Sequence, residues 1–240
     1  EMKAVIQELK MYRDKYLRSV IDELIGMIFS DHPYHHPIIG YKQDLWSVHS
    51  KDLHAFYSKH YHPNNATLIV VGDVKPEEVF AVAQKDFGHI PAQPNYKKEP
   101  TYFNQDLVSK SVVLHRDIQQ PLVCLTFVVP GMTEKKDHLL DLLAYVVGKG
   151  KSSRLYKKLV DELQLCTSLS AGSEELFDHG LFFILVEPNK QEDIPTIELI
   201  VQKELENIAQ KGITNNELMR ALKQARMSRY DVLEDTEHQA

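Results

Sequence analysis

The order of segments in the second half of the chain constrains its fold most. Strand-like runs and helical stretches come in pairs and do not alternate one by one. In chain order they are strands 109–116 and 121–130, helices 135–148 and 153–163, strands 165–172 and 179–188, and helices 193–210 and 215–232. This order predicts an α+β fold, in which two-layer domains pack a largely antiparallel sheet on helices, and not a doubly wound parallel sheet.

The first part of the chain begins with a long amphipathic run. Apolar residues recur at helical spacing from Met2 to Phe29, which predicts helix over several turns. A short helix is expected at 52–61 and a buried strand at 66–74. Proline at the first helical position and glycine at the end then favour a helix from Pro76 to Gly88.

A proline-rich segment, 89–100, has the composition of an interdomain linker. A chain of 240 residues can form two modest domains, and we place them at 1–95 and 96–240. Near the end, Thr214 with Glu217 three residues later predicts a capping box that starts the last helix.

Composition and charge narrow the class of protein. The hydrophobic share of 43% is that of a globular protein, and the net charge of −6 without a basic cluster argues against nucleic-acid binding. The longest apolar runs are too short for a transmembrane segment. Cys124 and Cys166 lie in apolar strand-like contexts without metal-type spacing, which favours buried free thiols over a disulfide or ligand pair. The compartment stays open.

Seven of the twelve histidines lie between positions 32 and 62, which raises the possibility of a metal site. His32 and His36 are four residues apart, but Pro33 and Pro37 argue against a continuous helix there. Neither HExxH nor HxxEH occurs in the chain. Spacing therefore favours histidines that lie on the surface or pack loops.

Two further segments have a functional and a plain interpretation. Gly150-Lys151-Ser152 resembles the end of a phosphate-binding loop, but Tyr145 stands where the first glycine is required, so a helix–helix turn is favoured. Arg154 and Tyr156, near the start of a helix, either bind a substrate or are ordinary exposed helix residues.

Glu1 and Glu8 form the remaining candidate. Residues seven apart on an α-helix differ by about 20° around the axis, so both carboxylates share one face at the border of the apolar stripe. Geometry alone leaves two readings open: solvated helix glutamates, or a pair of acids aimed into a cleft.

Several segments together resemble the M16 family of zinc metallopeptidases, the pitrilysin, insulinase and mitochondrial processing peptidase group. In order, these are EMKAVIQELK, HPYHHPIIGYKQDL, DLHAFYSKHYHPNNATLIVVGDV and FGHIP, then VGKGKSSRLYKKLVDELQL and HGLFFILVEP across the linker. The resemblance covers nearly the whole chain. It implies the fold of the LuxS/processing-peptidase-like metallohydrolases, with 1–95 as the C-terminal part of the zinc domain and 96–240 as a second domain truncated at its C-terminus.

The resemblance also implies specific roles. In the family an HxxEH helix supplies two histidine ligands and the glutamate that activates water, and a later helix supplies a third, glutamate ligand. EMKAVIQE matches that later helix, which gives Glu8 the role of zinc ligand and Glu1 that of supporting acid. The HxxEH segment would lie upstream of Glu1, so we expect no activity and no bound Zn2+ in this chain alone. Phe182 stands where some members carry a substrate-binding arginine, so the substrate-binding residues stay unknown.

The resemblance implies peptide or small-protein substrates, and a second M16-like subunit or a homodimer as partner. A zinc metalloendopeptidase is the first hypothesis, and a non-catalytic M16-like scaffold subunit is the alternative. If the first part of the zinc domain is missing, apolar helix and strand faces should be exposed in this chain.

Overall fold

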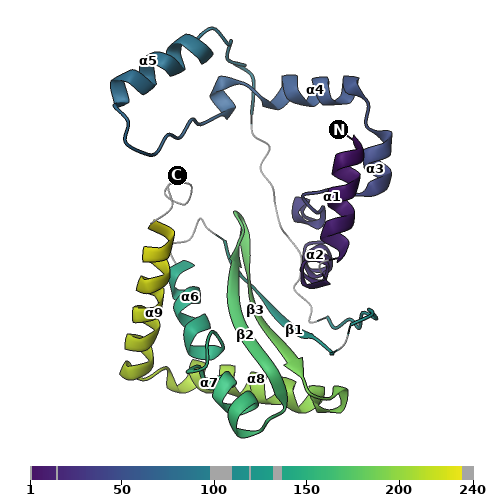
Figure 1. Cartoon of the computed structure of the whole chain (residues 1–240), viewed down its shortest axis with the longest axis vertical. Coiled ribbons are helices and arrows are strands. Elements are labelled where there is room, and N and C mark those ends of the chain that lie inside the picture. The colour runs from purple at the N-terminus through teal and green to yellow at the C-terminus, as the bar shows by residue number, and fades with distance from the viewer. Residues whose placement is uncertain (1, 15, 98–109, 119, 132–136, 234–240) are drawn as a thin grey trace. The chain divides into compact units, whose positions relative to one another are not determined.

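The computed structural model describes residues 2–14, 16–97, 110–118, 120–131 and 137–233, and divides into two compact units (Figure 1). The first unit is Glu1–Ser111 and the second is Val112–Gln239. The domain limits predicted from the sequence, 1–95 and 96–240, stay a prediction. Each unit is described separately below.

The second unit is built on a three-stranded antiparallel sheet. Its strands are β1 (Val123–Pro130), β2 (Cys166–Glu175) and β3 (His179–Pro188), in the order β1-β3-β2. Since side chains alternate across a strand, the register pairs of β3 with both neighbours divide the residues between two faces. Ile184, between Leu125 and Ala171, lies on one face, and Phe183 lies on the other.

Among the described residues of this unit, the helices pack on the face that carries Ile184. They are α6 (Asp137–Val147), α7 (Arg154–Tyr156) with the continuing π-helical turn η3 (Lys157–Glu162), α8 (Ile194–Lys211) and α9 (Asn215–Leu233). Their apolar side chains form one core with the sheet: Ala144, Val147, Leu155, Leu159, Leu169, Phe182, Ile184, Val186, Ile197 and Val201 are each at most 5% exposed. The predicted two-layer α+β architecture is therefore confirmed in this unit.

A glycine on the uncovered face allows a close aromatic contact. A Cβ atom added to Gly172 of β2 would lie 2.8 Å from the ring of Phe183 on β3. The Phe183 ring therefore lies over the β2 backbone at Gly172, its register partner, where no side chain is in the way. Any larger residue at position 172 would displace Phe183.

Local sequence signals mark the ends of α8 and the start of α9. α8 has Pro195 in its first turn and ends at Gly212, whose φ of 72° favours glycine. The backbone N–H of Glu217 donates to Thr214 Oγ1 at 3.3 Å, and that of Thr214 donates to Glu217 Oε2 at 2.8 Å. This reciprocal pair is the predicted capping box of α9.

The first unit is helical. Its elements are α1 (Met2–Asp14), α2 (Tyr16–Ile28), η1 (Pro33–His35), α3 (Lys42–Ser47), α4 (Ser50–His60), η2 (Pro63–Asn65) and α5 (Pro76–Phe87). The helical prediction for 2–29 is confirmed by α1 and α2, and those for 52–61 and 76–88 by α4 and α5. Leu9 and Phe29 are its buried apolar anchors, at 3% and 0% exposed.

Two strand predictions are wrong for the described residues. Residues 66–74 form no strand and are exposed, although we expected a buried strand, and 110–116 form none either. Strand formation requires a neighbouring strand to accept and donate the backbone hydrogen bonds, and neither segment pairs with another in the described chain. The local sequence favours extended structure but cannot supply that partner.

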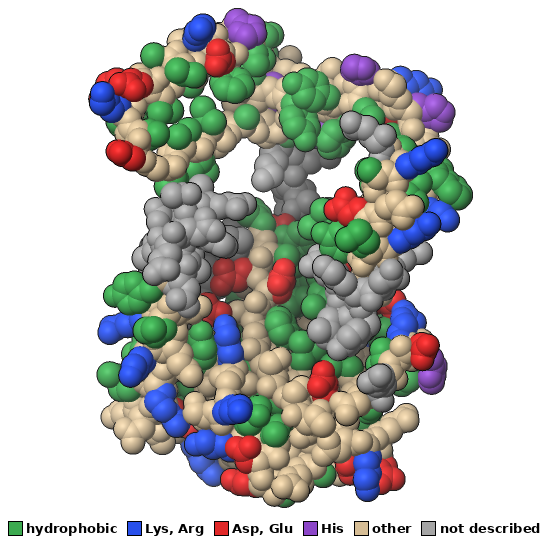
Figure 2. Space-filling view, in the orientation of Figure 1, with side chains coloured by type: hydrophobic (Ala, Val, Ile, Leu, Met, Phe, Trp, Pro, Cys, Tyr) green, Lys and Arg blue, Asp and Glu red, His purple; other side chains and the backbone are tan. Residues whose placement is uncertain are grey.

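Many apolar side chains of the first unit are open to solvent. Figure 2 shows hydrophobic groups on the surface of α4 and α5. The segment 66–74 and these helices expose Leu53, Phe56, Leu68, Ile69, Val70, Phe80 and Val82, each at 46% or more. No helix in the described part of the chain is long and apolar enough to cross a membrane.

Candidate functional site

Glu8 lies on α1, and its side chain is exposed. It is one turn from Val5 and from Tyr12, while the neighbouring Leu9 is buried and anchors the helix. Within the described chain, Glu8 makes no hydrogen bond or ion pair, so its carboxylate is available to a ligand. Glu1, the predicted supporting acid, lies outside the described residues.

A cavity of about 390 Å³ opens beside this helix, between α1, α2 and the loop that follows η1. Leu9 and Tyr12 line it from α1, and His35 lines it from η1. The ring of His35 is held because Nδ1 donates to the carbonyl oxygen of Gly26 at 2.8 Å. Tyr12 follows Glu8 by four residues, so the cavity lies next to the face that carries the candidate ligand.

His32 and His35 pack against a loop of the first unit, whereas His36, His49 and His54 lie on the surface, and the spacing favoured these two placements. His32 is 3% exposed and its Nδ1 accepts the backbone N–H of Tyr34 at 3.2 Å, which begins η1. Its ring lies 5.9 Å from that of Phe29 and 4.1 Å from that of Tyr34. Among the residues that the structure describes, no group of three or more His, Cys, Asp or Glu is placed to hold a metal ion.

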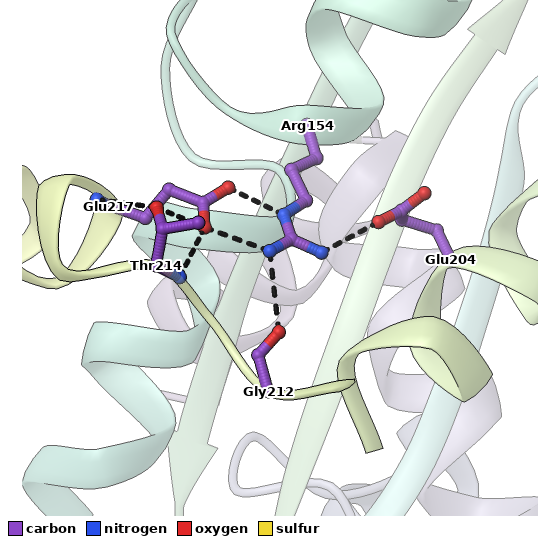
Figure 3. Close-up of polar contacts among 5 residues, drawn as sticks. All are labelled: Arg154, Glu204, Gly212, Thr214 and Glu217. Carbon is purple, nitrogen blue, oxygen red and sulfur yellow. Dashed lines mark hydrogen bonds and ion pairs between the residues drawn. The ribbon is translucent and has the colours of Figure 1, made fainter. Parts of the chain in front are cut away.

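Arg154 forms the strongest polar cluster among the described residues (Figure 3). Nε and Nη2 donate to the two carboxylate oxygens of Glu217 at 2.6 and 2.8 Å, and Nη1 donates to Glu204 at 3.0 Å. Nη2 also donates to the Gly212 carbonyl at 3.4 Å. The guanidinium thus joins the start of α7 to α8, to the following turn and to α9. We call these residues, with Thr214, the Arg154 cluster.

This geometry favours a structural role for Arg154 over the substrate-binding alternative. The side chain is 23% exposed, and those of Glu204 and Glu217 are 12% and 14% exposed. A bidentate guanidinium–carboxylate pair in this shelter is among the stronger polar contacts of a fold. The sequence identified Glu217 as a helix cap. Its pairing with Arg154 could not be predicted, because the two residues are 63 positions apart and no local pattern connects them.

The Arg154 cluster has a consequence for acid stability. Hydrogen bonds from Arg154, together with the Thr214 cap, lower the pKa of Glu217 from 4.5 to about 2. Because the folded-state pKa is depressed, this stabilisation is fully present above about pH 4.5 and is lost as the pH falls towards 2. The full shift corresponds to a contribution on the order of 3 kcal/mol.

We therefore expect the melting temperature of the second unit to fall more steeply between pH 5 and pH 2.5 in the wild type than in Glu217→Gln. Circular dichroism at a series of pH values measures this difference. Glu198→Gln, an exposed change on α8, is the matched control and should keep the wild-type slope. Parallel curves for wild type and Glu217→Gln would contradict the assignment.

The glycine-rich segment at 148–153 is a helix–helix turn, as favoured over a phosphate loop. Gly150 has a φ of 90°, and Ser153, 1% exposed, donates its hydroxyl to the Gly150 carbonyl at 2.7 Å. The ammonium group of Lys149 lies 4.6 Å from the centre of the Tyr145 ring. These contacts close the turn between α6 and α7.

Phe182 and Cys166 are buried, and Cys124 is half-buried. Phe182 is 3% exposed and lies in the core, on the helix-covered face of β3, so a side chain at this position is not presented to a peptide. Both cysteines are free; Cys166 is buried and Cys124 half-buried. Burial raises the pKa of the Cys166 thiol to about 11 and also raises that of Cys124.

The antiparallel sheet of the second unit and the helices packed on it define the class as a two-layer α+β protein. A family model described as the peptidase M16 inactive domain matches residues 47–225. The chain therefore belongs to the M16 peptidase family.

Individual relatives agree with this assignment. The chain is similar to the zinc protease PqqE of Helicobacter pylori, at 32% identity over 194 residues that make up 78% of this chain and 43% of that protein. An uncharacterized zinc protease of Mycobacterium leprae is 24% identical over 221 residues, or 90% of this chain and 49% of that protein. The chain thus spans about half the length of these curated relatives.

Solved structures give the same fold. The crystal structure of a protease from Helicobacter pylori matches with a TM-score of 0.77 and 26% identity, over 99% of this chain and 58% of that one. A putative M16-like peptidase from Alicyclobacillus acidocaldarius matches with a TM-score of 0.73 and 19% identity, over 100% and 57%. The second likeness bears on the fold alone.

Proposed function

We propose that this chain contributes the third zinc ligand, Glu8, to an M16-type metalloendopeptidase whose HxxEH segment lies elsewhere in the polypeptide. The observation that carries the proposal is an exposed carboxylate that has no partner among the residues the structure describes, at the matching position of the matching helix. Curated relatives bear the name zinc protease, which supports the same chemistry.

The described residues fit one position of such a site and not a complete one. They present Glu8 on α1, and no cluster of three metal-binding side chains occurs in the described ranges. A bound zinc ion would lower the pKa of a coordinated water and polarise a peptide carbonyl. Glu8 would hold the ion, and buried Leu9 would fix the helix that presents Glu8. Glu1 would support Glu8 from the same face of the helix.

The substrate is proposed to be an extended peptide, and the cavity beside α1 is a candidate for one of its side chains. Leu9 follows Glu8 directly on the helix and Tyr12 follows it by four residues. Both form part of the cavity wall, so a peptide held next to Glu8 would reach this cavity. A second M16-like subunit or a homodimer is proposed as partner. The domain limits 1–95 and 96–240 belong to the same proposal.

A non-catalytic scaffold subunit remains the second candidate, because the matched family model is that of an inactive domain. That match begins at residue 47, however, and so does not include α1 or Glu8. The word inactive therefore describes the part of the chain that lacks the candidate ligand. Retention of Glu8 favours the catalytic proposal.

Metal analysis separates the two functions. We expect the 240-residue chain alone to bind no stoichiometric zinc, since one carboxylate is too few ligands for a tetrahedral site. A polypeptide that carries this chain behind an HxxEH segment should bind one zinc and hydrolyse peptides. Measurement by atomic absorption and by cleavage of a quenched fluorescent peptide tests both. Absence of zinc in the longer polypeptide would favour the scaffold.

A further inference from the structure

The outer face of α9 combines exposed cationic and exposed apolar side chains. It consists of six residues: Met219, Arg220, Lys223, Arg226, Met227 and Tyr230. Its three apolar side chains are each at least 57% exposed, and its three cationic side chains are exposed as well. At 100° per residue the six positions span about 120° of the helix circumference. Figure 2 shows basic and hydrophobic groups side by side over this helix, and we call the six residues the α9 outer face.

The opposite side of α9 belongs to the fold of the second unit. The helix packs on α6, and Ala221 on this side is 2% exposed. Glu217 is the one acidic residue in the sequence from Asn216 to Tyr230, and its carboxylate is held by Arg154 and by the helix cap. Within the described chain the three cations of the α9 outer face form no ion pair. This face therefore presents positive charge, although the whole chain has a net charge of −6.

The exposed side of α8, in the same unit, has a different composition. It carries both signs of charge, on Glu198, Lys203 and Glu206, and Leu199 is its one large exposed apolar side chain. A mixed polar surface of this kind is what a solvated helix needs. The α9 outer face has instead one sign of charge and three large apolar side chains. Arginine, methionine and tyrosine are enriched where proteins bind one another, so its composition is that of an interaction surface.

A groove of about 810 Å³ lies along the α9 outer face. The described residues that line it are Asn216, Met219, Arg220, Leu222, Lys223 and Arg226. Unbranched methionine side chains adapt to the shape of a bound group. The groove can therefore receive apolar side chains of a partner, while the cations beside them attract its carboxylates.

The arrangement of charge distinguishes among the possible partners. A second copy that used the same face would place its three cations opposite these three, and like charges repel. A helix that lies on a membrane separates its apolar and cationic side chains onto opposite faces. In α9 the two kinds of side chain share one face, and the opposite side packs on α6. An acidic protein surface with apolar side chains among its carboxylates is complementary to this pattern.

We propose that the α9 outer face binds an acidic amphipathic helix of a partner protein. Carboxylates of that helix lie against Arg220, Lys223 and Arg226, and its apolar side chains lie against Met219, Met227 and Tyr230. Packing of this kind is the helix-in-groove mode of recognition. The inference does not depend on the proposed peptidase activity.

A designed acidic helix tests the proposal with the 240-residue chain. The probe is a fluorescein-labelled peptide of three heptads, with Leu at positions a and d and Glu at e and g. Fluorescence anisotropy should show saturable binding that weakens at least about tenfold between 50 and 300 mM NaCl, because salt screens the charge pairs. A second peptide with Ala in place of each Leu should bind at least about tenfold more weakly, since it lacks the apolar contacts.

Two triple variants with matched charge make the test specific. The first neutralises the cations of the α9 outer face by Arg220→Gln, Lys223→Gln and Arg226→Gln. It should weaken binding at least about tenfold while far-ultraviolet circular dichroism stays unchanged. The control removes three exposed lysines elsewhere in the second unit by Lys157→Gln, Lys203→Gln and Lys211→Gln, and its Kd should stay within about twofold of the wild type.

Four results would overturn the proposal. The first is a wild-type chain that does not bind the Leu/Glu peptide, which requires no variant to fold. The second is equal loss of binding in the two triple variants. The third is sedimentation of the wild type with phosphatidylcholine–phosphatidylserine vesicles that the first triple variant abolishes, which assigns the face to a membrane. The fourth is a wild-type dimer that the same variant dissociates, which assigns the face to a second copy.

Discussion

Glu8→Gln is expected to remove zinc and peptide hydrolysis from an M16 polypeptide that contains this chain and an HxxEH segment. Loss of an outer partner of a metal ligand already costs about 10–100-fold in metal affinity or activity. Loss of a ligand should therefore cost at least about 100-fold. Zinc content after dialysis and kcat/KM on an extended peptide measure the two effects.

A matched control distinguishes the ligand from a general charge effect. Glu198→Gln removes the same charge from an exposed position on α8 and should leave zinc content and kcat/KM unchanged. If Glu8→Gln retains both zinc and activity, the ligand lies elsewhere. If the wild type itself binds no zinc, the scaffold alternative replaces the catalytic proposal.

Arg154→Met is expected to destabilise the second unit by about 3–5 kcal/mol, the range for breaking a sheltered ion pair by removal of one partner. The carboxylates of Glu204 and Glu217 would remain 12% and 14% exposed without the guanidinium between them. Denaturant unfolding followed by far-ultraviolet circular dichroism measures the change. Fluorescence of the single tryptophan is unsuitable, because Trp46 belongs to the first unit.

Arg220→Met, an exposed change on α9, is the control and should shift the free energy of unfolding by less than about 0.5 kcal/mol. The double variant Arg154→Met with Glu217→Gln should lose less than the sum of the two single changes, since the residues interact directly. Additive losses would show that Arg154 and Glu217 act independently.

The sequence predicted those parts of the fold that depend on local pattern. The three strands of the second unit lie within a few residues of their predicted positions, because apolar runs bounded by Gly and Pro are local signals. The α9 capping box was predicted from two residues for the same reason. The segment 66–74 was not predicted correctly, since a strand is completed only by residues distant in the sequence.

The candidate site, too, was predicted only where the signal is local. Helical spacing placed Glu1 and Glu8 on one face, but only the family resemblance gave Glu8 a proposed role, and no HxxEH motif occurs in this sequence. The Arg154 cluster was missed because it joins positions 50 and 63 residues apart. Phe182 could not be assigned a face until the register of β3 was known.

The shelter of the two thiols makes the chain suitable for site-directed labelling. A thiol with a raised pKa is largely protonated at neutral pH and reacts slowly with maleimides and oxidants. A cysteine introduced at an exposed position, for example by Glu198→Cys on α8 or Glu77→Cys on α5, would then carry nearly all of the probe. A pair of such probes, one in each unit, would measure how the units move in solution without prior removal of Cys124 and Cys166.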